Sequence, residues 1–199
     1  LTNTGAGLAV LKNKATLTDY NAELLFTAAE GCSTGVLGRW NAGTGYALSH
    51  DADGAIRLIR KDGGTDTLLG SMTRQELYSR GIRILPGRNY TLRLYLYQDR
   101  IWGFLDGERL FAVNDASYAS GVTAISGTPG AAIVSLTTSP AFDVPTRYLE
   151  DREGHPVAGL RAYAGHTPEL TPYRLRALYH DGSEKFADLD AVPMEGTFS

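Results

Sequence analysis

The residues best suited to bind a ligand lie on one predicted β-strand, Tyr90–Tyr97. Leucine recurs at every second position from 92 to 96, so this side of the strand is expected to be buried. Arg93, Tyr95 and Tyr97 then lie together on the opposite side. Sugars have apolar C–H faces that stack on aromatic rings, and vicinal hydroxyl groups that form paired hydrogen bonds with arginine. The alternation therefore predicts a face that can bind a glycan.

Aromatic and basic residues on neighbouring predicted strands could extend this face or its rim. They are Arg39, Trp40, Tyr46, Arg57 and Trp102, and with the three residues above they complete the candidate ligand-binding set. Other interpretations stay open. The face could be covered by the C-terminal segment or a neighbouring domain and act as a scaffold, or it could bind a protein partner as an adhesion module. An enzyme is the remaining alternative.

Catalytic patterns do not support the enzyme. The sequence lacks the E-x-D-x-E carboxylate pair of retaining glucanases and the H-E-x-x-H metal motif. The acidic cluster Glu150–Glu153 adjoins glycine and proline and is expected to be a solvated turn. The four histidines all adjoin turn-forming residues and are expected at the surface: they are His50, His155, His166 and His180. We therefore assign no catalytic residue to this chain.

Composition limits the choice of partner. The 199-residue chain has a net charge of −3, so no basic surplus favours nucleic acid. No apolar run is long enough to insert into a membrane. The chain begins at Leu1 without a signal peptide, and we expect it to be part of a longer protein. Its single cysteine, Cys32, can form no internal disulfide.

Strand patterns dominate the first three quarters of the chain. The predicted strands are 20–28, 35–40, 46–50, 55–61, 90–97, 101–107, 108–113, 131–137 and 141–144. Asp106-Gly107 predicts a tight hairpin, and Thr73–Tyr78 carries the one plausible helical turn, with a capping box. Prolines and charges interrupt the alternation between residues 140 and 156, so we place a junction there. A further hairpin is expected from residues 173–179 and 184–189.

The segment Pro86–Leu110 resembles the "G-x-x-Y-x-L-x-V … D-x-I-x-x-Y-L-D-G-x-x-L" hairpins of the concanavalin A-like jelly rolls. This superfamily includes laminin-G-like domains and fructan-binding modules attached to levanases. Gly35–Arg39 and Leu58–Gly63 are similar to the strands that precede those hairpins, and the resemblance covers residues 5–145. It implies an all-β fold, a two-sheet antiparallel jelly-roll sandwich over residues 1–145.

Residues 146–199 are expected to form a linker and a short additional C-terminal β segment. Within it, Leu170–Ser183 resembles the "L-x-A-x-Y-x-D-G-S" strand and turn of bacterial immunoglobulin-like modules. The stretch is too short for a complete sandwich of that family.

The jelly-roll resemblance implies a non-catalytic, lectin-like module of a larger secreted or surface protein, with a glycoside hydrolase as the expected parent. Its partners would be an oligosaccharide or polysaccharide and the neighbouring domains of the parent chain, outside a bacterial cell or on its surface. No cofactor is implied except a structural calcium, which sandwich lectins often hold at a strand edge. The oxygen donors near the first and last strands are Asp19, Glu23 and Asp143.

Overall fold

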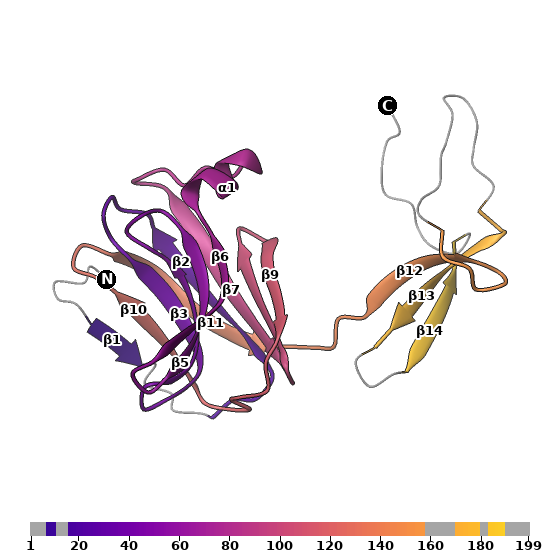
Figure 1. Cartoon of the computed structure of the whole chain (residues 1–199), viewed down its shortest axis with the longest axis horizontal. Helices are drawn as coiled ribbons and strands as arrows, with labels where there is room; N and C mark the ends of the chain where they lie inside the picture. Colours follow the sequence, from indigo (N-terminus) through magenta and orange to yellow (C-terminus); the bar gives the residue numbers. More distant parts are fainter. Residues whose placement is uncertain (1–6, 11–15, 158–169, 180–182, 190–199) are drawn as a thin grey trace. The chain divides into compact units, whose positions relative to one another are not determined.

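A computed structural model of the chain describes residues 7–10, 16–157, 170–179 and 183–189. The chain divides into two units, residues 1–142 and residues 143–199, close to the boundary predicted between residues 145 and 146. Figure 1 shows two sheets in the first unit and a small third sheet in the second. Among the helices of the described part, none has the length and apolar character needed to cross a membrane.

The first unit contains two sheets in which every neighbouring pair of strands is antiparallel. The six-stranded sheet has the order β1 (Gly7–Val10), β10 (Val122–Gly127), β3 (Thr34–Asn41), β4 (Thr44–His50), β5 (Ile56–Asp62) and β6 (Asp66–Met72). The five-stranded sheet has the order β11 (Ala132–Pro140), β2 (Tyr20–Thr27), β7 (Asn89–Tyr97), β8 (Arg100–Leu105) and β9 (Glu108–Asn114). The predicted strands from residue 20 to residue 137 are thus confirmed. The strand predicted at 141–144 is wrong, and β1, β6 and β10 were not predicted.

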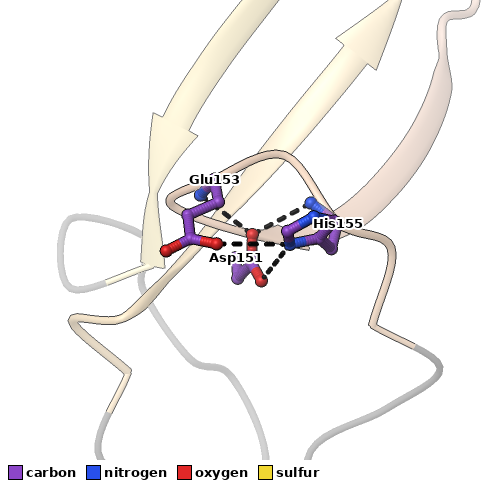
Figure 2. A group of neighbouring side chains, drawn as sticks. All are labelled: Asp151, Glu153 and His155. Atoms are coloured by element: carbon purple, nitrogen blue, oxygen red, sulfur yellow. Dashed lines mark hydrogen bonds and ion pairs between the residues drawn. The ribbon is translucent and has the colours of Figure 1, made fainter.

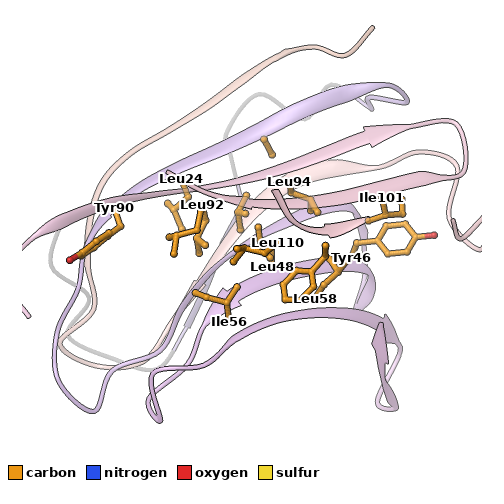
Figure 3. Packing of buried hydrophobic residues seen from close by; sticks show 14 of the residues in the cluster. Leu24, Tyr46, Leu48, Ile56, Leu58, Tyr90, Leu92, Leu94, Ile101 and Leu110 are labelled. Atoms are coloured by element: carbon orange, nitrogen blue, oxygen red, sulfur yellow. The ribbon is translucent and has the colours of Figure 1, made fainter. Parts of the chain in front are cut away.

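The two sheets bury one core between them, which Figure 3 shows from close by. Leu92 and Leu94 point from the five-stranded sheet toward Leu48 and Leu58 of the six-stranded sheet, and all four are fully buried. This is the side of β7 on which leucine alternates, so the predicted orientation of that strand is confirmed. The predicted two-sheet antiparallel sandwich is confirmed with it.

The structure also confirms the predicted hairpin turn and the predicted helical turn. Asp106 and Gly107 have φ angles of 47° and 85°, the positive values that a type I′ hairpin turn requires at both central positions. The predicted helical turn is α1 (Arg74–Ser79), and its capping box is formed. The Thr73 hydroxyl accepts a hydrogen bond from the Glu76 backbone N–H at 3.2 Å, and the Glu76 carboxylate accepts one from the Thr73 N–H at 2.7 Å.

The second unit contains a three-stranded antiparallel sheet of β12 (Thr146–Asp151), β13 (Tyr173–Leu178) and β14 (Glu184–Asp188). Its last two strands confirm the predicted hairpin. β12 corrects the expectation that Glu150–Glu153 is entirely a solvated turn, because Glu150 is a strand residue with only 3% of its surface exposed. Its carboxylate is buried because Arg174 donates a hydrogen bond to it at 2.7 Å. The likeness to an immunoglobulin-like module stays a prediction.

Candidate functional site

The outer side of the five-stranded sheet carries a continuous row of aromatic and basic side chains, which we call the aromatic–arginine face. Its members are Arg93, Tyr95 and Tyr97 from β7, Trp102 and Phe104 from β8, and Arg109 from β9. Antiparallel register sets Tyr95 directly opposite Trp102, and Arg93 directly opposite Phe104. Side chains that face each other across neighbouring strands are close enough to touch, so the register builds the row.

The rings of this face pack against one another. Tyr95 stacks on Trp102, with 4.7 Å between ring centroids and 23° between ring planes, and on Tyr97 at 6.3 Å. Two guanidinium groups lie over the outer rings: Arg93 is 4.0 Å from the Phe104 centroid, and Arg109 is 4.8 Å from the Trp102 centroid. The face therefore combines apolar ring surface with the hydrogen-bond donors of two guanidinium groups.

Tyr95 does not have the exposed position that the sequence predicted. Only 4% of its surface is exposed, since its ring lies in the middle of the row. Its hydroxyl group donates a hydrogen bond to the Phe142 carbonyl at 2.7 Å, which fastens the chain that follows β11. Tyr97, Trp102 and Phe104 are half-buried and supply the accessible aromatic surface.

Arg39 is also not on the predicted surface. It has a φ of 49°, which interrupts the alternation of β3 and turns the side chain inward, where 1% of the residue is exposed. Its guanidinium group donates to the carbonyls of Thr18 at 2.9 Å, Gln98 at 2.7 Å and Tyr118 at 2.9 Å, and it pairs with Asp19 at 3.3 Å. Arg39 is a structural clamp at the end of the sandwich where β2 and β4 begin.

Tyr46 lies at the same end and is fully buried, so its predicted place on the surface is wrong as well. Its hydroxyl group donates to the Asp115 carboxylate at 2.8 Å and accepts a hydrogen bond from the Tyr118 N–H at 3.2 Å. Burial raises the pKa of this hydroxyl group above its ordinary value of 10.0, and the bond to Asp115 adds to the shift. Arg60 donates to the other Asp115 oxygen at 2.8 Å. We call the sandwich end that Arg39 and Tyr46 occupy the closed end.

Trp40 and Arg57 lie on the outer side of the other sheet. Trp40 packs against a small cluster of Leu37, Ala47 and Ala124. Arg57 pairs with Asp51, and its second amino group lies 2.6 Å from the Asp53 carboxylate. The predicted set is therefore divided between two opposite faces and the interior. The structure brings together Arg93, Tyr95, Tyr97 and Trp102 alone.

The three predicted calcium donors lie in different surroundings. Asp19 pairs with Arg39 and accepts a hydrogen bond from the Gln98 N–H at 2.7 Å. Glu23 is exposed on β2, opposite Arg93, and Asp143 belongs to the second unit. A calcium ion held by these residues stays a prediction.

In the described part of the chain, one group of three acidic or histidine side chains has ligand atoms within 4.8 Å of one another. It is Asp151, Glu153 and His155 (Figure 2). The Asp151 carboxylate accepts hydrogen bonds at 2.9 Å from the backbone N–H groups of Glu153 and His155, and these bonds lower its pKa. Such bonds shape the turn after β12, so the cluster has a structural explanation. The exposure predicted for His155 is confirmed, whereas that predicted for His50 is wrong, because its ring lies against Phe26 and only 6% of the residue is exposed. His166 and His180 lie outside the described residues.

The segment Gly31–Gly35 matches the G-x-S-x-G spacing of a hydrolase nucleophile elbow, in which a serine sits on a turn between a strand and a helix. Here the segment leads directly into β3. The Ser33 hydroxyl accepts a hydrogen bond from the Ala52 N–H at 3.0 Å, and no bond from Ser33 to a histidine is formed within the described residues. The segment lacks the elbow geometry.

The sequence-based analysis missed two members of the aromatic–arginine face, Phe104 and Arg109. The signal for Phe104 was present, because Ile101, Gly103 and Leu105 alternate with Trp102 and Phe104. Arg109 reaches Trp102 past a register shift between Gly103 and Phe104, and that shift has no counterpart in the hydrophobic pattern.

Comparison with known proteins gives the fold its context. No protein-family model matches the chain, and no curated protein sequence matches it. Carbohydrate-binding module CBM66 from Bacillus subtilis is similar in structure, with a TM-score of 0.57 and 16% identity over 69% of this chain and 83% of that one. Chicken galectin 2 matches with a TM-score of 0.50 and 7% identity over 66% of this chain and 97% of that one. The agglutinin CG-16 from chicken liver has the same score and identity, over 67% and 99%. These likenesses confirm the predicted jelly-roll sandwich fold.

Proposed function

We propose that the sandwich is a non-catalytic carbohydrate-binding module and that the aromatic–arginine face contacts an oligosaccharide or polysaccharide. The observation that carries the proposal is the row of rings and guanidinium groups on one side of the five-stranded sheet. Half-buried rings offer apolar surface for sugar C–H groups, and arginine offers paired donors for vicinal hydroxyl groups. The fold likeness to a protein named as a carbohydrate-binding module supports the same reading.

The charge on this face suits a neutral or weakly acidic glycan. Arg93 and Arg109 contribute two positive charges, and the exposed Glu23 lies across from Arg93 on the neighbouring strand. Mixed charges of this kind supply both donors and acceptors to hydroxyl groups without a strong net field. A long polymer could lie along the row from Tyr97 to Phe104, because successive sugar rings can meet successive side chains.

The decisive experiment compares two tryptophans on opposite faces of the sandwich. Calorimetric titration against a panel of soluble polysaccharides should detect binding by the unmodified chain. Trp102→Ala should weaken that binding by about tenfold or more, since a large aromatic at a contact surface commonly contributes over 1 kcal/mol. Trp40→Ala is the matched control, because it removes a half-buried tryptophan from the other sheet and should leave binding unchanged.

The scaffold interpretation makes the opposite prediction. The rings stack on one another and Tyr95 is buried, which also suits a face that serves packing alone. If no polysaccharide binds, or if Trp102→Ala lowers thermal stability without changing affinity, the scaffold replaces the lectin. Hydrolysis of a glycoside by the purified chain would contradict the non-catalytic proposal.

The proposal extends to the setting of the module. We infer a bacterial protein that acts outside the cell or at its surface, with a glycoside hydrolase among its neighbouring domains. The support is the resemblance of Pro86–Leu110 to modules that accompany levanases. Fractionation of the source cells with an antibody against the sandwich tests this setting, and retention of the intact protein in the cytoplasm would contradict it.

A further inference from the structure

A pocket lies at the opposite end of the sandwich from Arg39. A cavity of about 300 Å³ opens where β2 and β4 end and β7 begins. It is bounded by α1, by the turns at 28–31 and 52–54, and by the segment 82–86. We call it the end pocket. A volume of about 300 Å³ is at the small end of ligand sites, so the end pocket suits a single ring or a molecule of similar size.

The wall nearest the core is apolar. Leu77 of α1 is buried, and Ile82 and Ile84 pack against the main hydrophobic core while they also line the pocket. Ala28 and Pro86 continue this wall. The pocket therefore offers a rigid apolar surface on one side, supported by the same core that holds the two sheets together.

His50 supplies a polar ring to the wall of the pocket. It is the last residue of β4, 6% of it is exposed, and its ring lies 5.7 Å from that of Phe26. Its ring lines the pocket, and its nitrogens form no hydrogen bond with any residue in the described ranges. These nitrogens are not among the buried polar atoms that lack a partner in the described structure, so they are open to the pocket. A ligand in the pocket that can donate or accept a hydrogen bond can therefore reach them.

The state of His50 restricts the ligand. Burial lowers the pKa of the imidazole below its ordinary value of 6.5, although the nearby carboxylates of Asp51 and Asp53 oppose the shift. At neutral pH the ring is therefore uncharged, with one nitrogen that donates and one that accepts. A hydroxyl group has the same dual capacity, which makes it a suitable partner.

The charges around the pocket cancel. Glu30 and Asp53 contribute two negative charges, and Arg74 and Arg83 contribute two positive ones. Asp53 is already paired with Arg57, and Arg83 donates to the Tyr78 hydroxyl at 2.7 Å while it lies over that ring. Glu30 and Arg74 have no ion pair within the described residues and can offer an acceptor and a donor group to a ligand. An anion or a cation gains nothing from a balanced lining, whereas a neutral polar molecule can use both signs.

We propose that the end pocket binds one neutral sugar ring, as a free monosaccharide or as the terminal unit of a chain. This inference takes its ligand chemistry from the proposed function and assigns it to separate residues. The apolar wall would accept a C–H face of the ring, His50 would hydrogen-bond a hydroxyl group, and Arg74 and Glu30 would meet hydroxyl groups at the rim. The aromatic–arginine face would then bind along a polymer, and the end pocket would recognise its end.

The test follows the His50 ring by NMR while glucose, galactose, mannose, fructose and N-acetylglucosamine are titrated separately into the full chain. At least one sugar should shift the ring resonances saturably, with a dissociation constant at or below the order of 10 mM. His50→Phe keeps a ring against Phe26 but removes both nitrogens, so calorimetry should show about tenfold weaker binding of that sugar. Ala52→Trp fills the pocket from its exposed rim and should abolish binding.

Separate variants distinguish the two sites. Trp102→Ala should leave the monosaccharide titration unchanged, and Ala52→Trp should leave binding of internal polymer segments unchanged. The inference is overturned if no sugar in the panel moves the His50 resonances, or if Ala52→Trp binds the sugar as well as the unmodified chain. It is also overturned if His50→Phe, once shown to be folded by circular dichroism, binds with unchanged affinity.

Discussion

The two ends of the sandwich treat buried polar side chains in opposite ways, and a single strand contributes to both. β4 points Tyr46, Leu48 and His50 inward. At the closed end, Tyr46 has hydrogen bonds to Asp115 and Tyr118, and Arg39 beside it has four partners. At the pocket end, four residues along the same strand, His50 is 6% exposed and has no hydrogen-bond partner in the described structure. At the closed end, the chain itself supplies the hydrogen-bond partners of the buried side chains. At the pocket end, a ligand can supply them.

This contrast separates stability from function. A fully satisfied buried network contributes to stability, and the loss of one member leaves the others unpaired in a medium of low dielectric constant. A ring that is open to the pocket, such as that of His50, can instead form its hydrogen bonds with a ligand. Mutations at the closed end should therefore unfold the protein, whereas mutations at the pocket end should change ligand affinity and leave stability nearly unchanged.

The largest effect is expected from Arg39→Met. The substitution keeps much of the side-chain volume but leaves the carbonyls of Thr18, Gln98 and Tyr118 without their donor. Each unsatisfied buried acceptor costs roughly 1–3 kcal/mol, so the free energy of unfolding should fall by at least about 3 kcal/mol. Urea unfolding followed by circular dichroism measures this. Arg88→Met, at an exposed turn, is the control, and similar midpoints for the two variants would show that the clamp is not structural.

A smaller effect is expected from Asp115→Asn. Burial alone would raise the pKa of Asp115, but hydrogen bonds from Ser117, Tyr46 and Arg60 outweigh it and hold the pKa at about 2, below the ordinary 3.8. A lowered carboxyl pKa stabilises the fold above pH 3.8, and this contribution is lost as the pH falls through about 2. Asp115→Asn should therefore reduce stability by about 2 kcal/mol at pH 7.

The stability of the two proteins at acid pH tests the role assigned to the Asp115 charge. Urea titrations at pH 7 and near pH 2 should show the two proteins converging as the native Asp115 becomes protonated. The exposed Asp66, which pairs with Lys61 at the surface, supplies the control substitution Asp66→Asn, for which little change is expected. A stability difference for Asp115→Asn that stays constant down to pH 2 would contradict the assigned role of the charge.

The same contrast shows what the sequence could reveal. Alternation over Tyr90–Tyr97 was enough to place the leucines in the core and Tyr95 and Tyr97 on the opposite side of the strand, because each strand position has one of two faces. The inward turn of Arg39 could not be foreseen, since it depends on a positive φ that breaks the period of two. For His50 the signal existed, because Tyr46, Leu48 and His50 are spaced by two. The neighbouring Asp51–Gly54 turn obscured it.

The strands that the sequence did not predict also depend on contacts between distant residues. In β6 the segment Asp66–Met72 includes Gly70, which weakens a strand pattern; a β-carbon there would lie 2.6 Å from the Phe111 ring. In β12 the charge of Glu150 suggested solvent, and its burial depends on Arg174, more than twenty residues later. Partners that are distant in sequence decide such cases, and a local pattern contains no information about them.

The smallest effect concerns pH at the pocket end. Burial lowers the pKa of His50, so the unfolded chain takes up a proton near pH 6.5 before the folded chain does. This proton uptake by the unfolded chain lowers the free energy of unfolding as the pH falls from 7 toward 5. The charged groups that surround the ring are Glu30, Asp51, Asp53, Arg74 and Arg83. His50→Phe should show a shallower loss over that range, by less than the changes expected at the closed end. Parallel curves for the two proteins would mean that the pKa of His50 is the same in the folded and unfolded chain, which would contradict the effect of burial on this ring.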